Sequence, residues 1–218
     1  MDPIVDFFNF VYSEHERYWW REPTRYSSDP DDHLASLITQ QTLRYFRDHR
    51  PPGRMLDIGA GEGADSIRMA KLGWQVSAID SSAVAVDKIR ALAAREGVDV
   101  RAQTGDLASL ELEEVFDLII CNGVLHYVED KTAACATLQR LTVPGGTNVI
   151  SLWSTFTPVP ACHQVVPTFP DDEYGVVYSA YQDWDKSLYY LERSKLEASH
   201  SDMPGHHHSF IKMIAHKG

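Results

Sequence analysis

Three glycines at alternate positions stand among acidic side chains in the segment LDIGAGEGADS. Gly59, Gly61 and Gly63 follow an apolar, strand-like segment and precede a helical one, so they lie at a predicted strand-to-helix turn. Because glycine has no side chain, a nucleotide-bearing cofactor can lie close to the backbone at such a turn. The segment therefore predicts a cofactor site.

The glycine motif by itself fits two classes of cofactor. Its first two glycines and Ala64 also satisfy the G-x-G-x-x-G/A dinucleotide pattern, and Asp80, about 20 residues further on, suits ribose recognition in either class. Tyr127 and Lys131 form a Y-x-x-x-K pair of the kind that short-chain dehydrogenases use for hydride transfer, although the glycine spacing of that family differs. A nicotinamide-dependent oxidoreductase therefore stays open as an alternative.

Alternating strand-like and helical segments must position these residues. We expect strands over 54–59, 74–80, 98–103, 115–121 and 148–153, and helices over 64–72, 83–96 and 124–141. This alternation of strands and helices is typical of an α/β fold with a doubly wound, mostly parallel sheet. The binding sites of such folds lie at the carboxyl ends of the strands. The segments 187–198 and 208–217, joined by a polar turn, predict a closing antiparallel hairpin.

The remaining segments predict one domain over residues 1–218. Two helical stretches, over 3–18 and from 31 to about 48, form an N-terminal helical lid within 1–50, ahead of a cofactor-binding core over 53–153. Residues 154–218 supply a substrate-side loop and the closing strands. We interpret the proline-rich stretch 157–170 as an active-site loop, followed by a short helical patch from Tyr178 to Trp184.

Composition limits the partners and the location. The formal net charge is −11, with 31 acidic and 20 basic side chains, so we expect no nucleic-acid partner. The N-terminus has neither a basic leader nor a long apolar run, which predicts no membrane association. Three cysteines, Cys121, Cys135 and Cys162, have no CxxC pairing and fit a reducing compartment. We therefore expect a cytoplasmic protein.

Five ordered motifs resemble those of class I S-adenosylmethionine-dependent methyltransferases that act on small molecules. They are LDIGAGEG, AIDSS, TGDL, FDLIICNGVLHYV and LTVPGG, and they cover Arg54 to about Trp153. The resemblance implies a Rossmann-like sheet of seven strands, S-adenosylmethionine as cofactor and S-adenosylhomocysteine as product.

The same resemblance implies a set of cofactor-binding residues. In that family the glycine turn approaches the methionine part of the cofactor, an acid after strand two accepts both ribose hydroxyls, and an acid after strand three contacts adenine. The corresponding residues here are Asp57, Gly59, Ala60, Gly61, Gly63, Asp80, Ser81, Asp106, Leu107 and Asn122.

Methyl transfer is an in-line displacement. A protein can accelerate it largely by orienting the nucleophile and excluding water, so no catalytic residue is strictly required. His126, just past the fourth strand, is the candidate general base, although a packing role fits it too. We expect aromatic and imidazole groups to line the acceptor side; the candidate substrate residues are Tyr18, Trp19, Tyr127, Trp153, Tyr181 and His208.

The C-terminal third resembles tellurite-resistance and thiopurine methyltransferases more loosely, and the acidic glycine turn departs from that group at Glu62, Ala64 and Asp65. The acceptor atom therefore stays open among oxygen, nitrogen, sulfur and a heavier chalcogen. His206 to His208 suggest a metal, but consecutive strand residues point to opposite faces and no carboxylate or cysteine obviously completes a ligand set, so we expect none. A non-catalytic S-adenosylmethionine sensor is a further alternative.

Overall fold

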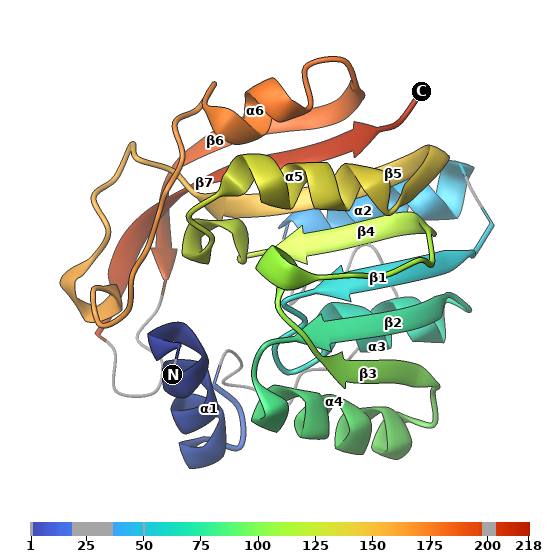
Figure 1. Ribbon diagram of the computed structural model, residues 1–218, viewed down its shortest axis with the longest axis horizontal. Coiled ribbons are helices and arrows are strands. Elements are labelled where there is room, and N and C mark those ends of the chain that lie inside the picture. The colour runs from blue at the N-terminus through green and yellow to red at the C-terminus, as the bar shows by residue number, and fades with distance from the viewer. Residues whose placement is uncertain (1, 19–36, 50, 198–203) are drawn as a thin grey trace.

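A seven-stranded sheet forms the centre of the molecule (Figure 1). The computed structural model describes residues 2–18, 37–49, 51–197 and 204–218. Its strands are β1 Arg54–Ile58, β2 Gln75–Asp80, β3 Val100–Thr104, β4 Phe116–Asn122, β5 Thr142–Trp153, β6 Asp185–Glu197 and β7 His206–His216. They lie in the order β3-β2-β1-β4-β5-β7-β6. β1 to β5 pair in parallel and β7 pairs antiparallel with both β5 and β6, which confirms the predicted sheet and its closing hairpin.

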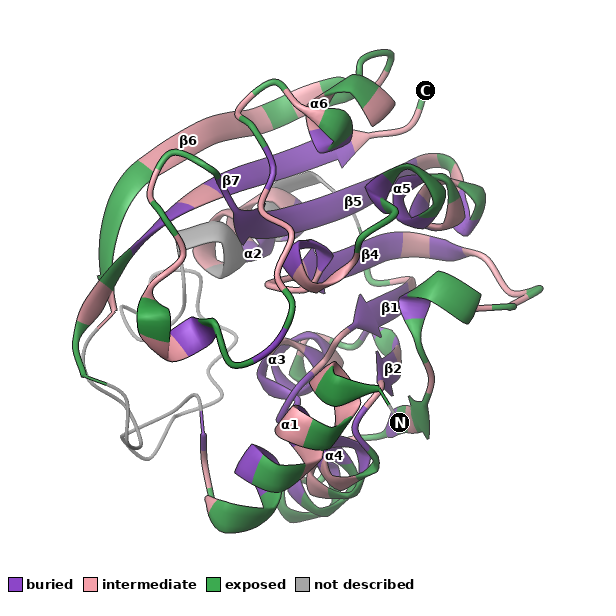
Figure 2. Cartoon of the chain, turned by 60° about the vertical axis from the view of Figure 1, so that its left-hand side comes forward, coloured by how far each residue is buried: buried purple, intermediate pink, exposed green. Residues whose placement is uncertain are grey.

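Helices cover both faces of this sheet, as expected for a doubly wound fold (Figure 1). They are α1 Pro3–Glu14, α2 Leu37–His49, α3 Ala64–Lys71, α4 Ala83–Glu96, α5 Lys131–Arg140 and α6 Val176–Ala180. Side chains of β4 alternate between two buried clusters: Leu118 and Ile120 pack with α2, α3 and α4, whereas Ile119 and Cys121 pack with α5 and α6. A central strand buried on both faces explains the unbroken apolar run in the sequence (Figure 2).

The segment 124–141, predicted as one helix, is broken. A short 3-10 turn, η2 Leu125–Tyr127, comes first, and α5 begins only at Lys131. The Asp130 carboxylate accepts a hydrogen bond from the backbone N–H of Ala133 at 2.9 Å. Because an aspartate favours the cap over the interior of a helix, the chain restarts there. The break places His126 and Tyr127 in the turn that follows β4.

Two further boundaries differ from the prediction. β5 begins at Thr142 and not at residue 148, and it accommodates its glycines through a register shift against β4. α6 spans Val176–Ala180 and not 178–184. The Asp171 carboxylate accepts the backbone N–H groups of Val176 at 3.1 Å and Val177 at 2.8 Å, so a residue outside the helix sets its start.

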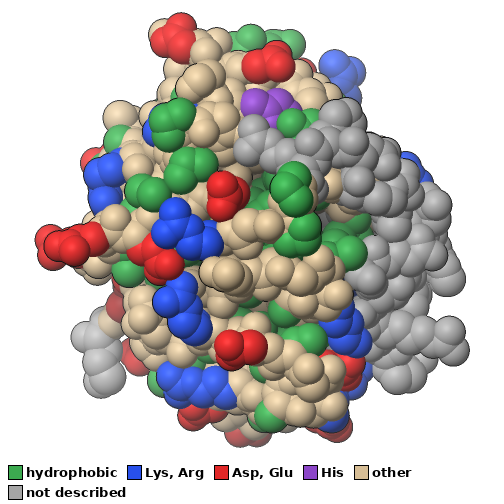
Figure 3. Space-filling view, turned by 90° about the vertical axis from the view of Figure 1, so that its right-hand side faces the viewer, with side chains coloured by type: hydrophobic (Ala, Val, Ile, Leu, Met, Phe, Trp, Pro, Cys, Tyr) green, Lys and Arg blue, Asp and Glu red, His purple; other side chains and the backbone are tan. Residues whose placement is uncertain are grey.

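The parallel strands all end at the same edge of the sheet, on the left in Figure 1. α1 and the connection between β5 and α6 lie at this edge. On the face shown in Figure 3, which is turned toward the opposite edge, acidic and basic side chains are interspersed. No helix in the described part of the chain is long and apolar enough to cross a bilayer.

Candidate active site

The glycine turn between β1 and α3 adopts backbone conformations that side chains disfavour. Gly59 has φ +63°, and a Cβ there would lie 2.2 Å from Val124 Cγ2. Gly63 has φ +85° and precedes the first residue of α3, where an added Cβ would lie 3.0 Å from Ile89 Cγ1. Both glycines therefore permit close packing of the turn, the first against Val124 after β4 and the third against α4.

Asp80 ends β2 directly opposite this turn. Its Oδ2 accepts the Gly61 backbone N–H at 2.8 Å and its Oδ1 accepts that of Ser82 at 2.9 Å. Burial raises the pKa of this carboxyl, and the two backbone hydrogen bonds oppose that shift. Each carboxylate oxygen has a further lone pair, so the group is oriented and can still accept donors from a ligand.

A second acidic group lies deeper beneath the turn. Asp57 Oδ2 accepts the Ser66 hydroxyl at 2.6 Å, and burial, followed by the negative charge of Asp65, raises the pKa of Asp57 to about 8. Asn122 Nδ2 donates to Asp65 Oδ2 at 3.4 Å, while Ser151 Oγ donates to Asn122 Oδ1. The ends of β1, β4 and β5 are thus linked through one polar cluster.

A cavity of about 600 Å³ opens at this edge of the sheet. The predicted cofactor residues that line it are Asp57, Gly59, Ala60, Gly61, Asp80, Ser81, Asp106, Leu107 and Asn122. Gly63 is the exception, because its role is the turn itself. Asp106 also accepts the backbone N–H of Ala108 at 3.0 Å and so caps the short turn that carries Leu107.

At the other end of the cavity an indole ring lies between two imidazoles. The Trp153 ring stacks on His126 at 4.0 Å between centroids and on His208 at 4.4 Å. Tyr127, Trp153 and His126 line the cavity. His208 supports this wall from behind and does not line the cavity, so the predicted aromatic and imidazole wall forms with only part of the expected set.

The hydrogen bonding of His126 determines its tautomer. Its Nδ1 accepts the backbone N–H of Trp153 at 3.2 Å, so the neutral ring carries its proton on Nε2. Burial, followed by the positive charges of His208 and His163, lowers the pKa of His126 well below its usual range. The ring therefore stays neutral near pH 7 and presents a donor at Nε2.

Several residues predicted to contact the methyl acceptor do not line the cavity. Tyr181 is fully buried in the core behind α5, and its hydroxyl accepts the side-chain N–H of Asn148 at 2.7 Å. Tyr178 and Trp184, which bound the predicted helical patch, also lie outside the cavity lining and pack against Tyr189 and Tyr181 respectively. Tyr18 is buried beside the cavity but does not line it, and Trp19 lies outside the described residues.

The cavity is also lined by residues that the sequence did not point to. The closing hairpin contributes Lys195, Glu197, Phe210 and Lys212, and α3 contributes Arg68. The hairpin residues occur at alternate positions of β6 and β7, and such alternation places them on one face of the sheet. That pattern was available in the sequence, but the closeness of this face to the glycine turn was not.

The expectation that nothing completes a ligand set around the histidine run was wrong. His206 and His208 lie on the same face of β7, and ligand atoms from His163 and Glu197 approach them. The proline-rich connection brings His163 to this position, against the Trp153 ring. Its described part lines none of the cavity, although the Phe169 backbone N–H donates to the His126 carbonyl at 2.7 Å.

The Y-x-x-x-K pair does not form a dehydrogenase-like dyad. Tyr127 belongs to η2 and Lys131 to α5, so the two residues do not share a continuous helix. Lys131 Nζ donates to the Val128 carbonyl at 3.2 Å, and only Tyr127 lines the cavity. This geometry offers no support for hydride transfer.

A doubly wound sheet with a glycine turn facing an oriented carboxylate defines an α/β protein that binds a nucleotide-type cofactor. Residues 55–146 match a family model described as a methyltransferase domain. The central part of the chain is therefore similar to methyltransferase domains, and its strand order and glycine turn agree with that similarity.

Curated relatives match parts of the chain. The chain is 29% identical to Hemagglutinin 1 of Eikenella corrodens over 76% of its own length and 55% of the relative. It is 39% identical to a ubiquinone biosynthesis O-methyltransferase of Xanthomonas campestris over 46% of its own length and 43% of the relative. The chain thus spans about half the length of these curated relatives.

The solved structure of TehB from Haemophilus influenzae shows the same fold. It superposes with a TM-score of 0.73 at 18% identity, covering 86% of this chain and 64% of that protein. Other solved methyltransferases of this fold hold S-adenosylhomocysteine.

Proposed function

We propose that this protein transfers a methyl group from S-adenosylmethionine to a small-molecule acceptor. The observation that carries the proposal is the buried Asp80 carboxylate, oriented by two backbone N–H groups and facing the cavity next to the glycine turn. Such a carboxylate matches the two hydroxyl donors of a ribose. This carboxylate would also suit the ribose of a nicotinamide cofactor, but the separation of Tyr127 from Lys131 gives no support to hydride transfer, and the similarity of residues 55–146 to a methyltransferase domain favours methyl transfer.

The residues of the cavity fit the parts of this cofactor. Asp80 and Ser81 would hold the ribose, and Asp106 with Leu107 would hold the adenine. The glycine turn and Asp57 would face the methionine part, where a positive group beside Asp57 would favour its ionised form. Arg68, which lines the same end of the cavity, supplies a positive charge suited to a carboxylate.

When bound, S-adenosylmethionine supplies a methyl group activated by a positive sulfur. The chain's own contribution is to orient the acceptor and to exclude water. Trp153 and Tyr127 form a large apolar wall at the acceptor end, while Lys195 and Glu197 of β6 provide polar contacts there. These groups suit a small, partly apolar acceptor with an oxygen, nitrogen, sulfur or chalcogen nucleophile.

We propose that His126 acts as a hydrogen-bond donor. In the tautomer set by the Trp153 backbone, Nε2 carries a proton and has no free lone pair for a general base. A donor at this position can bind a lone pair of the acceptor and orient its nucleophile. Removal of the acceptor's proton then falls to water or to the acceptor's own acidity.

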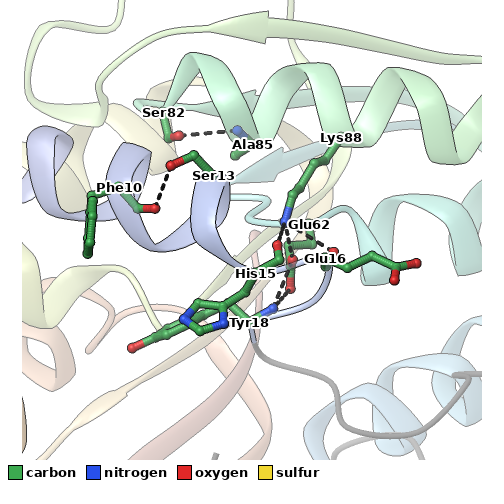
Figure 4. Close-up of polar contacts among 9 residues, drawn as sticks. All are labelled: Phe10, Ser13, His15, Glu16, Tyr18, Glu62, Ser82, Ala85 and Lys88. Carbon is green, nitrogen blue, oxygen red and sulfur yellow. Dashed lines mark hydrogen bonds and ion pairs between the residues drawn. The ribbon is translucent and has the colours of Figure 1, made fainter. Parts of the chain in front are cut away.

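We also propose that the N-terminal segment over residues 2–18 acts as a lid connected to the glycine turn, whereas α2, the other helix of the expected lid, packs on the sheet and none of its described residues lines the cavity (Figure 4). Both oxygens of the buried Glu62 carboxylate accept the Tyr18 backbone N–H at 3.0 Å, and Lys88 Nζ pairs with Glu62 Oε1 at 2.9 Å. The same ammonium donates to the carbonyls of His15, at 2.5 Å, and Glu16, at 3.1 Å. Contact between the cofactor and the turn would therefore act directly on the segment after α1.

Three free cysteines support a cytoplasmic location, and two of them, Cys121 and Cys135, are buried apolar-cluster residues. The acidic composition supports an acceptor other than a nucleic acid.

The decisive experiment is calorimetric titration of the purified protein with S-adenosylhomocysteine, with reduced and oxidised nicotinamide cofactors titrated in parallel. We expect saturable binding of S-adenosylhomocysteine alone, followed by turnover of an acceptor in a panel of small phenols, amines, thiols and chalcogen anions. Binding of only a nicotinamide would overturn the proposal. Binding without turnover of any panel member would favour the sensor alternative.

A further inference from the structure

Three histidines and one glutamate converge beside the acceptor end of the cavity. One ligand atom from each of His163, Glu197, His206 and His208 lies within 4.8 Å of the other three. His163 Nε2 is 2.8 Å from His206 Nε2, and Glu197 Oε2 is 3.2 Å from Nε2 of both His206 and His208. The four residues come from the proline-rich connection, β6 and β7, so only the folded chain assembles them.

The hydrogen bonds around His206 show which atoms face the centre of the cluster. The Pro204 carbonyl lies 2.7 Å from His206 Nδ1 and accepts its proton, so a neutral ring directs the Nε2 lone pair inward. That lone pair then meets the Glu197 carboxylate and the His163 imidazole at close range. Nitrogen atoms at this distance require either a hydrogen atom on one of them or a metal ion between them.

The burial of the cluster favours a metal ion over a mobile proton. His163 is 4% exposed and His208 is 2% exposed, and His208 Nε2 makes no hydrogen bond within the described part of the chain. Imidazole nitrogen and carboxylate oxygen are the ligands that zinc takes in proteins, with bonds of about 2.0–2.2 Å. A tetrahedron of such bonds separates its ligand atoms by about 3.4 Å, close to the distances found here.

We propose that His163, Glu197, His206 and His208 bind one divalent transition-metal ion of the zinc class. The Trp153 ring separates this site from His126, and Glu197 lines the cavity itself. The ion therefore lies at the end of the cavity where the acceptor would bind. The binding of an acceptor at that end rests on the proposed function. Its charge would orient an acceptor heteroatom beside Glu197.

The test uses the full chain produced without a polyhistidine tag and stripped of metal with EDTA. Zn²⁺ is titrated calorimetrically, and Co²⁺ is added separately to record the visible absorption of tetrahedral coordination. We expect one equivalent of either ion to bind. His163→Ala and Glu197→Gln should each weaken binding by more than about a hundredfold, because even residues that only orient ligands contribute 10- to 100-fold.

His207→Ala is the matched control. His207 belongs to the same run but is exposed on the other face of β7, where its Nδ1 lies 2.9 Å from Ser194 Oγ. Its replacement should leave metal affinity within about twofold. Glu197→Gln keeps the shape of a partly exposed side chain, so a loss of metal binding in this variant with an unchanged melting curve reports coordination and not misfolding.

Two outcomes would overturn the metal site: no saturable binding at one equivalent, or equal losses in His207→Ala and the two ligand variants. S-adenosylhomocysteine is titrated into the stripped protein in the same series. Cofactor binding without metal binding would overturn this inference alone, whereas metal binding without cofactor binding would overturn the proposed function alone.

Discussion

The two ends of the cavity are built differently. At the end proposed to hold the cofactor, called the cofactor end, the glycine turn and Asp80 follow directly after adjacent parallel strands, and backbone N–H groups orient the carboxylate. At the acceptor end, side chains from η2, β5, β6, β7 and the proline-rich connection meet around the Trp153 ring. One end depends on strand termini, the other on packing between segments distant in sequence.

This difference agrees with the family model, which matches residues 55–146 around the glycine turn and does not extend to β6 and β7. Sheet topology constrains strand termini, so a motif placed there keeps its geometry. The acceptor wall depends on the register between β6 and β7, which shifts between Glu192 and Lys195, just before Lys195 and Glu197 reach the cavity. Changes at the two ends should therefore be separable by experiment.

Trp153→Ala should give the largest effect and should act on the acceptor end. The indole is 5% exposed and stacks on two imidazoles, so its loss leaves a cavity and should lower the free energy of unfolding by about 3–5 kcal/mol. Urea denaturation measures this loss. Affinity for S-adenosylhomocysteine in the folded variant should change less than twofold, and a large loss would show that the two ends are coupled.

Asp80→Ala should weaken the cofactor end. Two ribose hydroxyls that donate to a charged carboxylate contribute about 1.5–3 kcal/mol, so affinity for S-adenosylhomocysteine should fall roughly ten- to hundredfold. Calorimetry measures the change, with Asp80→Asn as the isosteric comparison. Asp106→Ala, at an exposed position, should cost less. Equal losses in the two alanine variants would contradict the assignment of Asp80 to the ribose.

His126→Gln tests how the acceptor is oriented. Gln keeps a donor, so turnover should fall by less than about tenfold, whereas loss of a general base would cost about 100- to 10,000-fold. The variant should also change the response to acid. Because burial lowers the pKa of His126, the unfolded chain binds a proton near pH 6.5 that the folded chain does not, and wild-type stability falls as the pH drops below that value.

The pH effect is measured as the difference in unfolding free energy between the two proteins across the acidic range. The wild type should lose more stability than His126→Gln as the pH falls, because only the wild type carries this imidazole. Parallel curves for the two proteins would show that His126 does not resist protonation.

The smallest effect should appear at the lid. A double-mutant cycle with Glu62→Gln and Lys88→Met should give a coupling energy of about 1 kcal/mol, because the carboxylate is buried and also holds the Tyr18 backbone. The pair Lys71–Glu96, at 2.6 Å but with both side chains partly exposed, is the control. Its coupling should lie below about 0.5 kcal/mol. Equal couplings would remove the argument for a connected lid.

The sequence by itself determined the order of the elements and most of the residues that line the glycine-turn end of the cavity. Alternating patterns located β1 to β4 and α3 and α4 closely, because a buried parallel strand and an amphipathic helix each have a local signature. The glycine turn, Asp57 and Asp80 were recognisable because each adjoins a strand end, and parallel topology brings strand ends together.

The tertiary structure alone decided the acceptor end. Tyr181 was predicted there from its type, but α6 packs on the outer face and buries it, whereas Lys195 and Glu197 reach the cavity through strand register. The separation of His163 from His208 in sequence also concealed their approach in space. Local patterns carry no information on which distant segments meet, because that is settled by the packing of the whole sheet.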